Sequence, residues 1–363
     1  MLFITFLVNV MTAVYKHQDL LRASIMSAGN TYRLGANEAP PAILSVFLGR
    51  TLSKMLDDLA TQVGDNKMTP EEKTALKLGI ARIPDIMLDT TDRNRTSPFA
   101  FTGNRFEFRA VGSSANCAAS IIALDAAVAH QLNEFRAEVD DLINAGKGKD
   151  EAIFQVLKKL IIESKPVRFE GDGYSEEWKA EAKKRGLTNI TSAPEAISKY
   201  LDKSSMEVLI GENVFNEVEL KGRVEVEYEK FSKKVQIESR ILGDIAINHI
   251  VPTAVAYQNR LIDNLCGLKQ LFDAKEYDVL SEDRKDLIRE ISSHVTAIKK
   301  LVKRMTEERH TANTAKSEHK TAVVYDSVVR PTMEEIRSHI DDLELVIDDD
   351  FWPMPKYREL LFS

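Results

Sequence analysis

Residues 91–109, TDRNRTSPFAFTGNRFEFR, form a first polar island, in which several arginines stand around one glutamate. Charged and aromatic residues alternate from Arg105 to Arg109, so a β-strand there would carry Arg105, Glu107 and Arg109 on one face and two phenylalanines on the other. A carboxylate between two guanidiniums suits a divalent cation that holds phosphate oxygens, because hard cations take oxygen ligands and guanidinium forks grip phosphate or carboxylate. The alternative is a surface ion-pair ladder on an edge strand.

A second polar island, residues 33–41, reads RLGANEAPP and contains Arg33 and Glu38. Its glycine and two prolines exclude a continuous helix or a central strand, so both charged residues are predicted to lie on an irregular loop. Loops often carry binding and catalytic side chains. The two islands together predict a site for an anionic ligand.

Helices are expected to position these islands. Apolar residues recur every three or four positions over 124–142, 224–245, 288–305 and 333–343, which predicts amphipathic helices and, from about residue 217, a bundle of long helices. The apolar segment 2–15 is predicted to be a buried helix, because it is too short to span a membrane and lacks the basic leader of a signal peptide. The polar segment 306–320 leaves open a solvated continuation of the preceding helix or a loop.

The composition indicates a globular, cytoplasmic protein. The chain has 363 residues, 44% hydrophobic and 29% charged, which favours about two domains with a sizeable core. Its net charge of -7 argues against nucleic acid as the main partner. Cys117 and Cys266 lack ligand-like spacing, so two buried thiols in a reducing compartment are expected. The scattered histidines show no HxxxH or HExxH grouping, so a ligand role is not expected for most of them.

The two islands together resemble those of the glutamine synthetases, and the sequence around them is similar to that of the type III branch. The segments that carry the resemblance are HQDLLRASIMSAGNTYRLGANEAPPAILSVFLG, NRTSPFAFTGNRFEFRAVGSS, KPVRFEGDGYSEEWKAEAKKRG, VQIESRILGDIAINHIVPTAVAYQNRL and WPMPKYRELLF. They extend over nearly the whole chain. The resemblance implies an α+β fold: residues 1–200 form the C-terminal part of a catalytic domain, a partial antiparallel sheet with helices, and residues 201–363 form a bundle of long helices.

The activity that the resemblance implies is an ATP-dependent ligase of glutamine biosynthesis and nitrogen metabolism. Such enzymes transfer the terminal phosphoryl group of ATP to the side-chain carboxylate of glutamate, and ammonia then displaces phosphate to give glutamine. The reaction requires Mg²⁺ or Mn²⁺. The family works as cytoplasmic homo-oligomers of stacked rings, so no membrane or nucleic acid is expected as a partner.

The resemblance also implies a role for six residues. Arg33 and Arg109 would bind glutamate, and Arg109 would also contact the transferring phosphoryl group. Glu38 would contact glutamate and accept a proton from ammonium. Arg95 would contact phosphate, ATP and glutamate, Arg105 would contact ATP, and Glu107 would be a metal ligand. Arg95 and Arg109, together with Glu38, are thus the catalytic candidates.

Two features depart from the family pattern. Ala100 stands where the type I pattern carries an ATP-side arginine, and Arg33 and Glu38 are one residue closer together than in that pattern. In the family, most metal ligands come from segments upstream of those matched here. One carboxylate cannot hold two or more divalent ions that each take about six oxygens. The chain alone is therefore expected to be inactive, and the alternative function is a noncatalytic helical oligomerisation module.

Overall fold

The computed structural model describes residues 2–35, 39–61, 97–112 and 115–362, except for the side chain of Tyr357. The chain divides into two compact units, Met1–Glu227 and Tyr228–Ser363, and the long helix α12 (Glu217–Ile245) runs from the first into the second. The assignment of residues 1–200 to a catalytic domain and of 201–363 to a separate helical domain stays a prediction.

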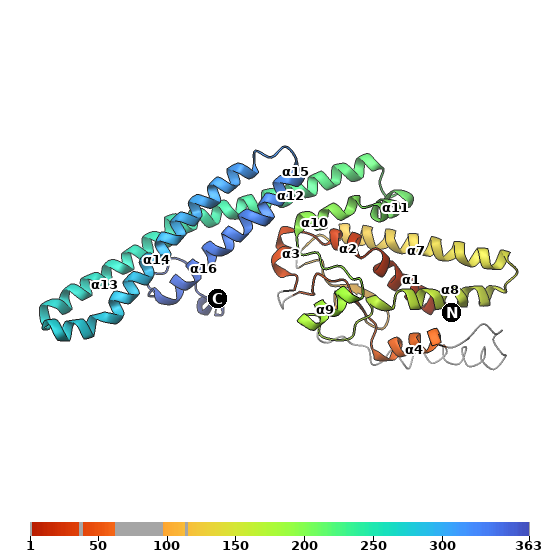
Figure 1. Ribbon diagram of the computed structural model, residues 1–363, viewed down its shortest axis with the longest axis horizontal. Coiled ribbons are helices and arrows are strands. Elements are labelled where there is room, and N and C mark those ends of the chain that lie inside the picture. Colours follow the sequence, from red (N-terminus) through yellow and green to blue (C-terminus); the bar gives the residue numbers. More distant parts are fainter. Residues whose placement is uncertain (1, 36–38, 62–96, 113–114, 363) are drawn as a thin grey trace. The chain divides into compact units, whose positions relative to one another are not determined.

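The first unit combines a small sheet with a larger number of helices, which Figure 1 labels. Before the sheet is complete, the helices are α1 (Leu2–Lys16), α2 (Gln18–Ser24), α3 (Ala28–Arg33) and α4 (Arg50–Thr61). After it come α7 (Ala118–Asn144), α8 (Lys149–Glu163), α9 (Glu176–Lys184), α10 (Ala193–Ser198) and α11 (Lys203–Gly211), with the short 3₁₀ helices η2 (Lys165–Val167) and η3 (Lys199–Leu201). The helix expected over 124–142 is confirmed as part of α7, and Gly146, just beyond its end, has a φ of 94° that favours glycine.

The sheet has three short strands in the order β1 (Val46–Phe47), β2 (Phe99–Phe101) and β3 (Phe106–Phe108). β2 and β3 are antiparallel but β1 runs parallel to β2, so the sheet is mixed and the expected partial antiparallel sheet is confirmed only for β2 and β3. A parallel neighbour needs a crossover connection of a dozen or more residues. The long segment between β1 and β2, which includes α4, provides that length.

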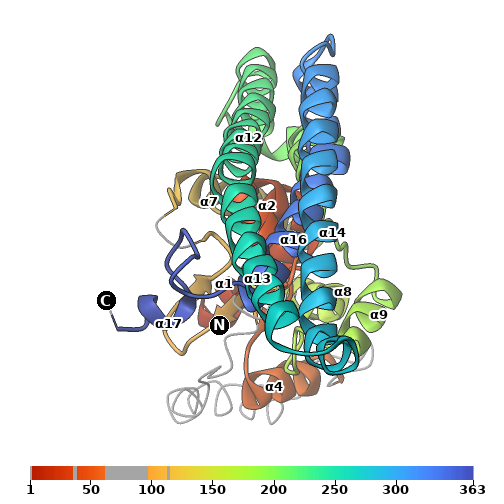
Figure 2. The same ribbon diagram turned by 90° about the vertical axis from the view of Figure 1, so that its left-hand side faces the viewer.

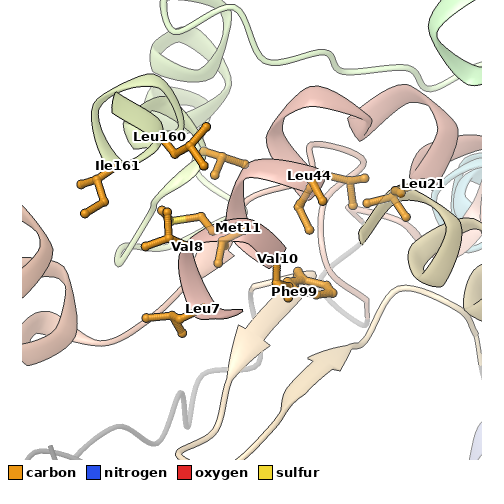
Figure 3. Packing of buried hydrophobic residues seen from close by; sticks show 14 of the residues in the cluster. Leu7, Val8, Val10, Met11, Leu21, Leu44, Phe99, Leu160 and Ile161 are labelled. Atoms are coloured by element: carbon orange, nitrogen blue, oxygen red, sulfur yellow. The ribbon is translucent and has the colours of Figure 1, made fainter. Parts of the chain in front are cut away.

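The core of the first unit is built around α1. Leu7, Val8 and Met11 of this helix are almost completely buried, and Figure 3 shows them in one cluster with Leu160 of α8 and Phe99 of β2. The expectation of a buried helix over the apolar segment 2–15 is therefore confirmed. Each large apolar side chain buried in this way contributes about 1.5–3 kcal/mol to folding, so α1 fixes the helices and the sheet to one another.

The second unit is made of long helices that pack side by side. After α12 come α13 (Val251–Leu271), α14 (Ala274–Ala312), α15 (Glu318–Val324), α16 (Arg330–Val346) and α17 (Tyr357–Leu360), with π-helical turns η4 (Ala246–Ile250) and η5 (Tyr325–Val329). α14 packs against both α13 and α16 (Figure 2). The helical bundle expected from the periodicity is confirmed, since its predicted segments fall inside α12, α14 and α16.

The segment 306–320, for which two alternatives were open, combines both. α14 continues to Ala312, a short turn follows, and Ser317 then begins α15 by accepting a hydrogen bond from the backbone N–H of Lys320 at 3.3 Å. Ser is a strong N-cap residue because its side-chain oxygen satisfies one of the unpaired amides of the first helical turn. A serine inside the polar segment therefore sets the boundary between the two helices.

Candidate functional site

The charged face of β3 has the arrangement expected from the alternation. Phe106 and Phe108 point to the core side, where their rings lie 5.0 and 5.9 Å from the ring of Phe99. Glu107 lies on the opposite face and accepts hydrogen bonds from both arginines of the RFEFR run. A strand with period two therefore separates a packed aromatic face from a charged one.

Glu107 sits between the two guanidiniums. Its Oε1 accepts from Nε and Nη2 of Arg105 at 3.3 and 3.2 Å, and its Oε2 accepts from Nε and Nη2 of Arg109 at 3.1 and 3.0 Å. Partial burial raises the pKa of Glu107, but the hydrogen bonds and charges of Arg109 and Arg105 outweigh it, so the pKa lies below its usual value. The carboxylate therefore stays ionised and keeps two positive charges beside it.

The two arginines differ in exposure. The side chain of Arg105 is 69% exposed, whereas that of Arg109 is 19% exposed. A long, solvated side chain can leave its partner at little cost, because surface ion pairs contribute only about 0–1 kcal/mol. Arg105 is therefore the more weakly held of the two partners, while the less exposed Arg109 holds Oε2 in place.

Asn30 joins the second island to the end of β3. The buried side-chain amide of Asn30 donates to the carbonyl oxygens of Ala110 at 2.9 Å and Val111 at 3.1 Å, directly after Arg109, and to Ile25 at 2.7 Å. Its Oδ1 accepts a hydrogen bond from Nη1 of Arg33 at 2.9 Å. No local pattern marks Asn30 as part of the site, because two of its partners, Ala110 and Val111, lie about 80 residues away along the chain.

Gly112 completes this junction. It has a φ of 110°, and a Cβ atom added to it would lie 3.1 Å from Nη1 of Arg33 and 3.2 Å from Oδ1 of Asn30. The guanidinium of Arg33 therefore lies against the backbone three residues beyond Arg109. Glycine allows both the backbone conformation and this close approach.

The remaining predicted residues can be placed only in part. Glu38 and Arg95 lie outside the described residues. The two ends of the Glu38 loop are joined, since Leu34 pairs with Ala39 and the N–H of Gly35 donates to the carbonyl of Pro40 at 3.1 Å.

Ala100, in β2, is completely buried and pairs directly with Glu107, so a small side chain stands beside the carboxylate. Direct cross-strand partners lie on the same face of a sheet.

A second ion-pair group fastens α4 to the sheet edge. The backbone of Arg168 bridges to Val46 of β1, and its Nη2 donates to Oδ1 of Asp57 in α4 at 2.7 Å. Nζ of Lys165 lies 3.1 Å from the same oxygen. Burial raises the pKa of Asp57, but the hydrogen bonds from Arg168 and Lys165 lower it more. This group is structural, because it ties a helix to a strand.

Among the residues that the structure describes, Glu107 does not belong to any group of three histidines, cysteines or carboxylates close enough to share a metal ion. As the only carboxylate identified on this face, Glu107 fits the ligand chemistry of a hard divalent cation but supplies one position of about six.

Two expectations outside the site are also settled. Among the described residues, no helix has the length and apolarity needed to cross a membrane. Cys117 and Cys266 are free, as expected, but both are exposed, so the prediction of buried thiols is wrong. Each stands on a solvent-facing position at or within a helix, which spacing along the chain did not reveal.

Comparisons with known proteins bear on the identity of the chain. Residues 152–269 match the family model described as the glutamine synthetase C-terminal domain. A glutamine synthetase of Bacteroides fragilis is 67% identical over 363 residues, which are all of this chain and 50% of that protein. A type-3 glutamine synthetase of Dictyostelium discoideum is 35% identical, over 99% of this chain and 48% of that protein.

A glutamine synthetase of Butyrivibrio fibrisolvens is 32% identical, over 99% of this chain and 50% of that protein. The chain thus spans about half the length of the curated relatives it matches. Over that length, the chain resembles the glutamine synthetases, a type-3 member included, as its two polar islands indicated.

Proposed function

We propose that this chain supplies part of the active site of a glutamine synthetase, which condenses glutamate and ammonia at the expense of ATP. The observation that carries the proposal is the junction between Arg33 and the end of β3, which brings the glutamate-binding candidates Arg33 and Arg109 to neighbouring backbone segments. Two guanidiniums on adjoining segments suit a substrate with two carboxylates, because each fork can bind one of them bidentately.

The other roles follow from the same chemistry. Arg105 and Arg95 contact the phosphates of ATP, and Glu107 holds Mg²⁺ or Mn²⁺, which when bound neutralises charge on the phosphoryl oxygens. Fixed positive charges provide most of the catalysis in phosphoryl transfer, since the protein has little covalent work to do. Glu38 accepts the proton of ammonium, because only neutral ammonia is a nucleophile.

Glu107 alone cannot complete a binuclear metal centre, so the chain by itself is proposed to lack activity. The remaining ligands belong to the half of the curated relatives that this chain does not match. We further propose that the complete protein works as a cytoplasmic homo-oligomer of stacked rings, as the resemblance implies. The two exposed, free thiols support a reducing compartment.

A chimera tests the catalytic proposal. This chain replaces the matching half of the Bacteroides fragilis relative, which shares 67% of its residues, and γ-glutamyl transfer is measured for the chimera and for the chain alone. The chimera is expected to be active and the chain alone inactive. Activity of the chain alone would contradict the incomplete site, and a folded, inactive chimera would favour the noncatalytic helical module.

Substitutions in the chimera then separate the roles. Arg109→Lys should lower kcat/KM by about a hundredfold or more, because lysine lacks the planar fork that binds two oxygens at once. Arg136→Lys is the matched control, since Arg136 lies on α7 with its side chain 82% exposed. Glu107→Gln should raise the Mg²⁺ or Mn²⁺ concentration that gives half-maximal activity. An unchanged metal titration would contradict the ligand role.

A further inference from the structure

Two helices of the second unit bring three possible metal ligands together. His294 lies on α14, and His339 and Asp342 lie on α16. Nδ1 of His294 is 3.0 Å from Nδ1 of His339 and 3.9 Å from Oδ2 of Asp342, and one ligand atom from each of the three residues lies within 4.8 Å of the other two. Residues three apart on a helix share a face, so His339 and Asp342 both project from α16 towards α14.

We propose that His294, His339 and Asp342 form a binding site for one transition-metal ion of the zinc class, distinct from the metal position at Glu107. Two imidazoles and one carboxylate are ligands that Zn²⁺ takes at about 2.0–2.2 Å, with water in the fourth position of a tetrahedron. Imidazole nitrogen also selects against Mg²⁺, which prefers oxygen. The site therefore differs in chemistry from the carboxylate position at Glu107.

The distances fit such an ion. Adjacent ligand atoms around tetrahedral zinc are about 3.3 Å apart for bonds near 2.0 Å, and the nitrogen pair and the nitrogen–oxygen pair are separated by 3.0 and 3.9 Å. The third separation, between the ligand atoms of His339 and Asp342, is no more than 4.8 Å. Modest side-chain rotations would bring all three ligand atoms to bonding distance.

The backbone positions that carry the ligands are fixed. Buried apolar residues flank them on both helices: Ile291 and Ile298 on α14, and Ile336, Ile340 and Leu343 on α16. The side chain of His294 is 16% exposed, whereas that of Asp342 is 52% exposed. The histidines are thus held at the edge of the helix interface, and the carboxylate side is open for an ion and its water to enter.

The hydrogen bond between the two histidines is the competing arrangement. Two Nδ1 atoms at 3.0 Å can share one proton, with one ring donating and the other accepting. A bound ion would replace that proton and take the lone pairs of both rings. It would then link α14 to α16 and stabilise the second unit by binding only its folded form.

Cobalt binding to the full chain tests the site. After treatment with a chelator, the chain is titrated with Co²⁺, whose visible absorption bands report tetrahedral nitrogen and oxygen ligands. One ion per chain is expected, displaced by Zn²⁺ but not by excess Mg²⁺. His294→Ala and His339→Ala should each weaken binding by about a hundredfold or more, since even outer partners of a metal ligand change affinity about 10–100-fold.

His310→Ala is the matched control, because His310 is an exposed histidine of the same helix, α14, and it should leave Co²⁺ affinity unchanged. Asp342→Asn, on the open side of the site, keeps the size of the side chain and should still weaken binding if either histidine variant fails to fold.

A second readout is the thermal unfolding of the second unit, followed by the fluorescence of Trp352 in a Trp178→Phe background. Zn²⁺ should raise the unfolding temperature in this background but not when His339→Ala is added. Absence of stoichiometric Co²⁺ bands, Co²⁺ affinities of the three variants equal to that of the wild type, or competition by Mg²⁺ equal to that by Zn²⁺ would overturn the proposal and leave the imidazole hydrogen bond as the whole function of the pair. None of these outcomes depends on ligase activity.

Discussion

Asn30 is expected to be the most sensitive position in the junction between the two islands. Asn30 is 2% exposed, and the two N–H groups of its amide are shared among three carbonyl oxygens, those of Ile25, Ala110 and Val111. Asn30→Ala removes these hydrogen bonds and leaves buried carbonyls without their donor. At a net of about 1 kcal/mol for each N–H group lost, and more for carbonyls left unsatisfied, the first unit should lose about 2–3 kcal/mol of unfolding free energy.

Asn30→Asp is the informative partner of this variant, because it keeps the shape but replaces the donor with an acceptor. A carboxylate oxygen would then face carbonyl oxygens at 2.7–3.1 Å. Arg33 offsets part of the repulsion, since it already donates to Oδ1. We expect Asn30→Asp to cost about 1–2 kcal/mol more than Asn30→Ala at pH 7. The difference should shrink in acid, where a protonated carboxyl can donate again.

Urea unfolding measures both variants in the first unit. The chain has two tryptophans, and Trp178 is buried in the first unit. In a Trp352→Phe background, fluorescence therefore reports that unit, and far-UV circular dichroism follows the whole chain. Variants within about 0.5 kcal/mol of the wild type, or an Asn30→Asp variant as stable as Asn30→Ala at pH 7, would refute the assigned hydrogen bonds.

Two further predictions concern Gly112 and His17. Gly112→Ala should destabilise the first unit by about 1–3 kcal/mol, through backbone strain and the close approach to Arg33; Gly146→Ala, with a similar φ and no atom within 4 Å, shares only the strain and should cost less in the same urea assay. Burial, then the charge of His130, lowers the pKa of His17 to about 4, so the folded unit holds this histidine neutral while the unfolded chain protonates it. The contribution of neutral His17 to the unfolding free energy is complete above about pH 6.5. It falls as the pH drops towards 4, by about 2 kcal/mol between pH 7 and pH 5. His17→Phe should lose this part of the pH dependence. Parallel profiles of unfolding free energy against pH for the wild type and His17→Phe would contradict the prediction.

Local patterns were sufficient for part of the site. The alternation in RFEFR predicted which side chains share a face, because neighbouring residues of a strand point to opposite sides whatever surrounds them. The apolar period of 3.6 likewise predicted segments of α7, α12, α14 and α16, since one face of each helix must be buried. The identities of Arg33, Arg105, Glu107 and Arg109, and their resemblance to a known family, were also readable from the chain.

Pairing across long separations was not readable. The parallel strand β1, the amide of Asn30 beside Ala110, and the approach of His294 to His339 each depend on how separate elements pack. Histidines 45 positions apart leave no spacing signal, so the sequence favoured no ligand role for them.

Sequence alone determined the periodic faces of the strands and helices and the chemistry that those faces present, because these follow from backbone geometry over a few residues. Only the tertiary structure decided which faces meet, because that depends on the burial and close packing of segments far apart along the chain.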